Sequence, residues 1–120
     1  MLRTVALMSM IYDVLLGVVF LAAPDAAARA FGIPPVTPPL IPNLTGLFAL
    51  GVGLCYILPL KDPARWRSLL WILGPILKGG GALLFLADHL FRHSPSSFLL
   101  FCGTDGILAA WTWIALRRTP

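Results

Sequence analysis

The chain has 120 residues, of which 58% are hydrophobic and 12% are charged, and its net charge is +4. Average soluble domains are about 25% charged, so this chain has too few charged side chains to cover a water-facing surface. The composition therefore excludes an ordinary soluble domain and indicates one membrane-embedded domain over residues 1–120. The basic residues are scattered instead of clustered, so the positive charge gives no support for nucleic-acid binding.

Four long apolar stretches predict four transmembrane helices, at about residues 4–23, 43–60, 66–87 and 96–116. Each stretch has about 18–22 residues, enough to cross a hydrocarbon core of about 30 Å at about 1.5 Å per residue. The first stretch is similar to a signal peptide, but Asp13 interrupts its apolar region and favours a membrane span. The predicted fold is all-α, an integral membrane four-helix bundle, because spans of this length satisfy their backbone hydrogen bonds only as helices.

The longest connection lies between the first two spans. Residues 24–32 are predicted to form a short interfacial helix that ends at Gly32. The prolines at positions 34, 35, 38, 39 and 42 then predict an extended path. This segment is either a stiff connector along the membrane surface or a docking or lid segment.

The basic residues in the short loops predict the orientation of the bundle. Arg29 and Arg92 lie on the side of the first connection. Six others lie on the side of both termini, namely Arg3, Lys61, Arg65, Arg67, Arg117 and Arg118. Because Lys and Arg favour the cytoplasmic side, we expect cytoplasmic N- and C-termini and a multi-pass protein of a bacterial inner membrane.

Three ionisable residues, Asp13, Lys78 and Asp105, lie near the middle of spans one, three and four. A charge at mid-membrane costs roughly 2.5–3.5 kcal/mol, so such residues usually face each other or a wet cavity. In the predicted orientation all three lie about 13–17 Å from the cytoplasmic surface. We therefore expect an Asp-Lys-Asp cluster in the core with one carboxylate in excess. It is either a structural clasp between helices or a site for a ligand, a proton or a cation.

The residues around Lys78 are poor helix formers. Gly79, Gly80 and Gly81 follow it directly, and Pro75 precedes it by three residues. Span three is therefore either broken there, as at the ion sites of transporters, or kinked and closely packed. In the first case the three glycines belong to the same ligand or proton site as Lys78.

His89 and His93 are four residues apart near the end of span three, and Asp88 is adjacent. On a helix they share a face and are weak candidates for a Zn or Cu site, but they form an incomplete ligand set. We therefore expect no metal site. No catalytic residue is expected either, because the chain has no G-x-S-x-G motif, phosphate loop or C-x-x-C pair.

Four short motifs occur along the chain: FGIPP after span one, DPARW between spans two and three, GPILKGGG in span three and TDGILAAW in span four. In this order they resemble a group of uncharacterised small bacterial four-transmembrane-helix proteins, loosely termed DoxX-like. The resemblance implies a four-helix inner-membrane protein and draws attention to Lys78 and Asp105. Because DoxX-like relatives are associated with redox and quinone-linked membrane complexes, it also implies such a complex.

The lack of a complete catalytic set favours a non-enzymatic function. The leading hypothesis is an accessory or ligand- or lipid-binding subunit of a membrane assembly. Its partners would be the lipid bilayer and other membrane proteins or a second copy of the chain. The midplane cluster and glycine run instead favour a proton- or cation-coupled transporter of small solutes. The resemblance favours a third alternative, a component of a quinone-linked membrane oxidoreductase. The residues identify no cofactor.

Overall fold

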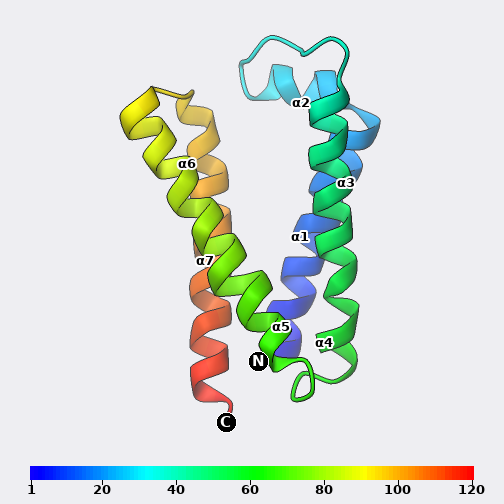
Figure 1. Ribbon diagram of the computed structural model, residues 1–120, viewed down its shortest axis with the longest axis vertical. Coiled ribbons are helices and arrows are strands. Elements are labelled where there is room, and N and C mark those ends of the chain that lie inside the picture. The colour runs from blue at the N-terminus through cyan, green and yellow to red at the C-terminus, as the bar shows by residue number, and fades with distance from the viewer.

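The computed structural model describes residues 1–120, and every regular element is helical (Figure 1). Four stretches are long and apolar enough to cross a membrane: Leu2–Ala22, Leu40–Lys61, Arg67–Arg92 and Ser96–Arg118. They have 21 to 26 residues. At about 1.5 Å per residue they are therefore about 31–39 Å long. The prediction of an all-α chain with four such stretches is confirmed, although the third continues beyond its predicted end at residue 87.

The first connection begins with a proline-defined helix boundary. α1 (Leu2–Ala22) stops before Pro24, because a proline ring disfavours helical geometry in the preceding residue. The same proline is the first residue of α2 (Pro24–Ala30). Its lack of an N–H costs nothing there, because an N–H in the first turn has no acceptor within the helix. Gly32 then has a φ of +70°, which glycine adopts without steric cost. The short helix closed by Gly32 is confirmed, and residues 33–39 form no regular element.

A second proline interrupts the second spanning stretch near its end. Pro59 has no N–H to donate to the carbonyl of Cys55, four residues earlier. The helix is accordingly interrupted at Tyr56, between α3 (Leu40–Cys55) and α4 (Ile57–Lys61). Both helices nevertheless belong to one continuous stretch of spanning length.

The third spanning stretch is widened, not broken. Pro75 has no N–H for the carbonyl of Trp71, and the backbone there is π-helical. This π-helical segment, η1 (Ile72–Lys78), joins α5 (Arg67–Trp71) to α6 (Gly79–Arg92). The three glycines after Lys78 are therefore helical, and a gap in the helix at this point is ruled out.

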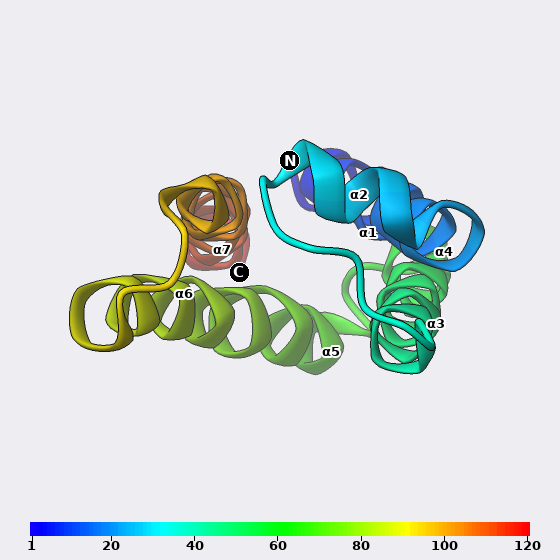
Figure 2. The same ribbon diagram turned by 90° about the horizontal axis from the view of Figure 1, so that it is seen from above.

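The four stretches form two helix pairs. α1 packs along α3, and η1 and α6 pack against α7 (Leu99–Arg118), which follows the short helix η2 (Ser96–Phe98). Both termini lie at one end of the molecule, the terminal end, where the pairs approach each other (Figure 1). At the opposite end, the α2 end, the pairs diverge, and α2 with its loop lies over the α1–α3 pair in the view from above (Figure 2).

Small residues allow the first pair to pack closely. A Cβ atom on Gly17 of α1 would lie 2.7 Å from the backbone nitrogen of Leu50 in α3. A Cβ atom on Gly46 of α3 would lie 2.8 Å from the carbonyl oxygen of Gly17. Because no side chain fits at these positions, the glycines bring the two backbones into direct contact.

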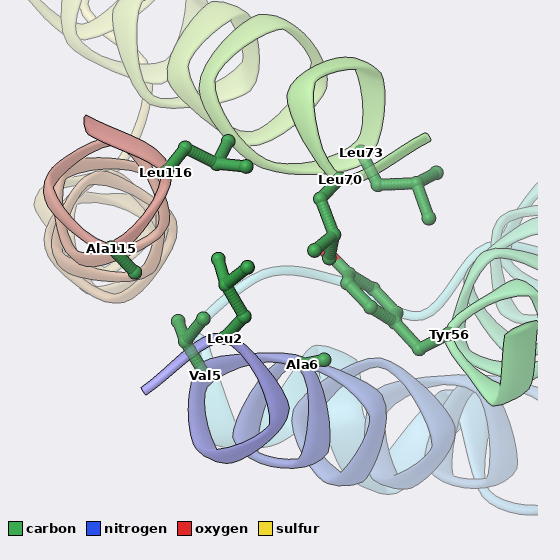
Figure 3. Close-up of a cluster of buried hydrophobic side chains, with 8 residues drawn as sticks. All are labelled: Leu2, Val5, Ala6, Tyr56, Leu70, Leu73, Ala115 and Leu116. Carbon is green, nitrogen blue, oxygen red and sulfur yellow. The ribbon is translucent and has the colours of Figure 1, made fainter. Parts of the chain in front are cut away.

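The apolar core lies at the terminal end, where all four stretches converge (Figure 3). It contains eight buried residues, namely Leu2, Val5, Ala6, Tyr56, Leu70, Leu73, Ala115 and Leu116. Because these come from α1, α5, η1, α7 and the junction of α3 with α4, this cluster holds the two pairs together.

The outer surface is strongly apolar. Only 22 of the 120 residues are buried, whereas Phe48 is 71% exposed, Leu83 69% and Ile107 67%. A surface with so many exposed large apolar side chains suits contact with lipid better than contact with water. The helix lengths and this surface together support a multi-pass membrane protein.

Candidate functional site

Asp13 and Lys78 form a buried ion pair between the two helix pairs. Nζ of Lys78 donates to Oδ1 and Oδ2 of Asp13, each at 2.7 Å. The two residues are only 6% and 4% exposed, so water hardly screens their attraction. Nζ also lies 5.4 Å from the ring centroid of Tyr12 and 5.8 Å from that of Tyr56, within the range of cation–π attraction.

The depth of this ion pair follows from its position in the helices. Asp13 is eleven residues after Leu2, and Lys78 is eleven residues after Arg67. At about 1.5 Å per residue, each lies about 17 Å from the terminal end of its helix. The two residues therefore meet near half-height, as the sequence predicted.

A second polar contact joins the helix pairs beside the first. The hydroxyl of Tyr12 in α1 lies 2.6 Å from Oγ1 of Thr104 in α7. Thr104 Oγ1 also donates to the carbonyl of Leu100 at 2.9 Å, which leaves the tyrosine as donor in the shared bond. Asp13, Lys78, Tyr12 and Thr104 together are called the polar clasp below.

Asp105, the third member of the expected cluster, lies near the Asp13–Lys78 pair but forms no ion pair with Lys78. The ion pairs of the chain are Lys78–Asp13 and Arg92–Asp88, and neither includes Asp105. The Asp105 side chain instead lines a cavity on the α2 side of the polar clasp. Both oxygens of Asp13 already accept from the single ammonium of Lys78, so Asp105 is the carboxylate in excess.

Two of the three glycines at the start of α6, Gly79 and Gly81, lie along the contact with α7. A Cβ atom on Gly79 would lie 3.7 Å from Cβ of Ala109, and one on Gly81 would lie 3.6 Å from Oδ2 of Asp105. Gly80 has nothing within 4 Å. Because the segment is helical, its carbonyls accept backbone hydrogen bonds and offer no ion site of the kind found in broken helices. Gly81 faces Asp105, and a Cβ atom there would be in ordinary van der Waals contact with its carboxylate.

The cavity lies between the two helix pairs at the α2 end and has a volume of about 420 Å³. Its wall comes from α1, α2, the proline-rich loop, α3, α6, η2 and α7, so most elements of the α2 end contribute to it. Twelve of its seventeen lining residues are hydrophobic. Its two charged lining residues, Asp25 and Asp105, are both acidic. Volume and lining are those of a site for an apolar ligand of moderate size.

Four phenylalanine rings form one wall of this cavity, and sequence reasoning missed them. The ring centroid of Phe101 lies 4.8 Å from that of Phe31 and 5.3 Å from that of Phe85. Phe98 lies 5.8 Å from Phe31 and 6.4 Å from Phe101. The available signal was the spacing of Phe98, Phe101 and Asp105, which places all three on one helix face.

The weak metal candidates at the end of α6 do not converge. Nδ1 of His89 lies 2.8 Å from the carbonyl oxygen of Ser94. Asp88 pairs with Arg92 at 3.2 Å, and His93 lies beyond the helix in a left-handed conformation. No group of three or more His, Cys, Asp or Glu side chains in the chain is arranged to hold a metal ion. Cys55 and Cys102 are both free thiols.

Comparisons with protein-family models, curated proteins and solved structures find no match. The geometry of the site is therefore the guide to its function. That geometry consists of a buried ion pair at half-height and an apolar cavity above it. Two carboxylates without an ion-pair partner, Asp25 and Asp105, line the cavity, and Asp105 is the one beside the buried ion pair.

Proposed function

We propose that this protein binds a lipid-like ligand in the cavity between its helix pairs, as a non-enzymatic subunit of a membrane assembly. The observation that carries the proposal is the cavity of about 420 Å³ with its apolar wall. A cavity of this size fits a small amphiphile or part of a lipid chain. Binding transfers apolar surface of the ligand onto packed side chains, and this gains close contacts that fluid lipid tails do not provide.

The polar clasp has a structural role in this proposal. Its four residues connect α1 to η1 and α7 next to the floor of the cavity. Inside a membrane, apolar surfaces alone give little preference for one helix partner over another, whereas buried polar contacts do. The clasp thus fixes the distance between the pairs and, with it, the width of the cavity.

The distribution of basic residues supports a bacterial-type inner membrane with both termini in the cytoplasm. Arg67 donates to the carbonyls of Leu116 and Thr119, and Arg3 donates to the carbonyl of Lys61 at 3.4 Å. These arginines all lie at the terminal end, together with most of the basic side chains. Since positive charge favours the cytoplasmic side, the cavity lies toward the opposite face of the membrane.

The test is to purify the protein in native-lipid nanodiscs, release bound molecules and identify them by mass spectrometry. Ala49→Phe places a ring in the cavity wall, whereas Ala110→Phe places the same ring on the exposed surface of α7. We expect a bound lipid-like molecule in the unmodified protein and in Ala110→Phe, and its loss in Ala49→Phe. Equal amounts in all three proteins would contradict the proposal.

One observation favours a second function, a proton- or cation-coupled transporter. Asp105 lines the cavity without an ion-pair partner, which is the arrangement expected of a carboxylate that exchanges a proton or cation. The buried and mutually bonded Asp13 and Lys78 do not support a conduit through all three residues. In proteoliposomes, proton flux that disappears in Asp105→Asn without loss of folding would favour transport over binding.

The extraction experiment also addresses the DoxX-like resemblance. A quinone is an apolar molecule with the general chemistry that the cavity accepts. Recovery of a quinone from the unmodified protein, together with a co-purified redox partner, would favour a component of a quinone-linked oxidoreductase. Recovery of ordinary lipid without such a partner would favour an accessory or lipid-binding subunit.

A further inference from the structure

We propose that the cavity is selective for a lipophilic cation, an amphiphile whose ammonium group pairs with Asp105 while its apolar part occupies the rest of the space. The inference rests on the proposed ligand-binding function and adds the chemical class of the ligand. Three observations carry it: the sign of the charges on the cavity wall, the pairing of the neighbouring groups, and the aromatic rings beside Asp105.

The charges on the wall are all of one sign. Asp25 of α2 and Asp105 of α7 line the cavity, and no lysine or arginine does. An anionic headgroup would therefore meet two carboxylates and no positive partner. A cationic headgroup meets complementary charge in a site where the surroundings are apolar and the attraction is poorly screened.

The nearest cation is already engaged. Lys78 donates to both oxygens of Asp13, and the pair is buried. Asp105 has no ion-pair partner within the chain. Two carboxylates and one ammonium thus lie at this level of the bundle. A bound ammonium would balance the remaining negative charge, and a carboxylate at this depth is costly without such a partner.

The aromatic wall lies where a cation at Asp105 would be stabilised. Phe101 precedes Asp105 by one helical turn on α7. The ring centroids of Phe85 and Phe31 lie 5.3 Å and 4.8 Å from the ring centroid of Phe101. The face of an aromatic ring attracts a cation within about 6 Å of its centroid. The carboxylate of Asp105 and the phenylalanine rings line the same cavity, so both can contact a bound ammonium group, and the aliphatic side chains of Leu16 and Ile33 provide an apolar wall for the remainder.

The experiment compares two photoreactive probes that differ only in the headgroup, a diazirine-bearing dodecylamine and the corresponding dodecanol. Each is added at equal mole fraction to the protein in nanodiscs, and labelled peptides are identified by mass spectrometry. In the unmodified protein we expect the amine to label cavity residues about tenfold more than the alcohol, which corresponds to about 1.4 kcal/mol. A charge-assisted hydrogen bond accounts for a difference of that size.

Asp105→Asn should abolish the preference for the amine without reducing labelling by the alcohol. Asp88→Asn is the matched control, because Asp88 lies outside the cavity and pairs with Arg92. A preference that persists in Asp105→Asn would overturn the inference. Labelling of the cavity by both probes without preference would also overturn it, while leaving the proposed binding function intact. Labelling of the cavity by neither probe would overturn both.

A competition experiment keeps the inference testable if Asp105→Asn does not fold. Unlabelled dodecylammonium or dodecanoate is added in excess to the unmodified protein before labelling with the amine probe. We expect the cation to suppress labelling of the cavity at least several-fold and the anion to leave it unchanged. Equal suppression by both competitors would show that only the apolar chain is recognised.

Discussion

Removing the ammonium of Lys78 should destabilise the bundle more than removing the whole ion pair. In Lys78→Met the carboxylate of Asp13 stays buried and loses both of its 2.7 Å hydrogen bonds. At that separation the attraction is about 6 kcal/mol at an effective dielectric of about 20. Since desolvation offsets part of it, we expect a net loss of about 3–5 kcal/mol in the free energy of unfolding.

The double variant Asp13→Leu/Lys78→Met provides the decisive comparison. It removes both charges. Met is close to Lys in volume, but Leu is larger than Asp, so the double variant should lose only about 1–3 kcal/mol through overpacking, less than Lys78→Met. Lys61→Met is the matched control, because Lys61 is exposed and its side chain forms no ion pair. We expect no change for this control beyond about 0.5 kcal/mol.

The measurement is reversible unfolding in mixed micelles with increasing mole fraction of dodecyl sulfate, followed by helical circular dichroism. A loss of less than about 1 kcal/mol in the free energy of unfolding of Lys78→Met would refute this prediction, since a buried and unpaired carboxylate is not compatible with so small a change. The prediction also fails if the double variant is as unstable as Lys78→Met, because the cost would then come from packing and not from the unpaired charge.

Three further predictions concern packing, the second polar contact and topology. Gly17→Ala should lower the free energy of unfolding by about 1–3 kcal/mol, because its Cβ would lie 2.7 Å from the Leu50 nitrogen. Gly51→Ala should leave this free energy unchanged, since nothing lies within 4 Å of a Cβ there. Equal unfolding midpoints for the two variants would contradict this prediction. Tyr12→Phe should lower the free energy of unfolding by about 0.5–1.5 kcal/mol, because it removes the hydrogen bond to Thr104. Adding Thr104→Ala to Tyr12→Phe should then cause little further loss in the same assay. Fully additive losses would argue against the hydrogen bond. A green fluorescent protein fused to the C-terminus should fluoresce in a bacterial host, and alkaline phosphatase fused there should be inactive; the reverse pattern would refute the proposed orientation.

Hydropathy and helix geometry were sufficient to predict the four long apolar helices and the common level of Asp13 and Lys78. Asp13 and Lys78 are each eleven residues from the start of their stretch, so their common level follows from helical rise alone. The end of the third stretch was predicted too early, because Asp88, His89 and Arg92 are polar although they continue the helix. Hydropathy reports the apolar part of a helix and not its hydrogen-bonded length.

The place of Asp105 was not predictable in the same way. Depth follows from counting residues, whereas the direction of a side chain around the helix axis depends on how the helices pack. In this chain the π-helical turn over Pro75 and the divergence of the two pairs direct Lys78 to Asp13 and leave Asp105 facing the cavity. The cavity itself also depends on Ile33 and Val36 of the proline-rich loop, which the sequence suggested only as a connector or lid.

The division into two helix pairs also means that the chain has a natural place at which it can be cut. Residues 62–66 form the turn that joins the pairs, and each side of it retains two complete spanning stretches. Each half is a helical hairpin with its own internal contacts, while the apolar cluster at the terminal end and the Asp13–Lys78 bond join the halves. We therefore expect two fragments produced separately to reassemble, with the ion pair specifying their register.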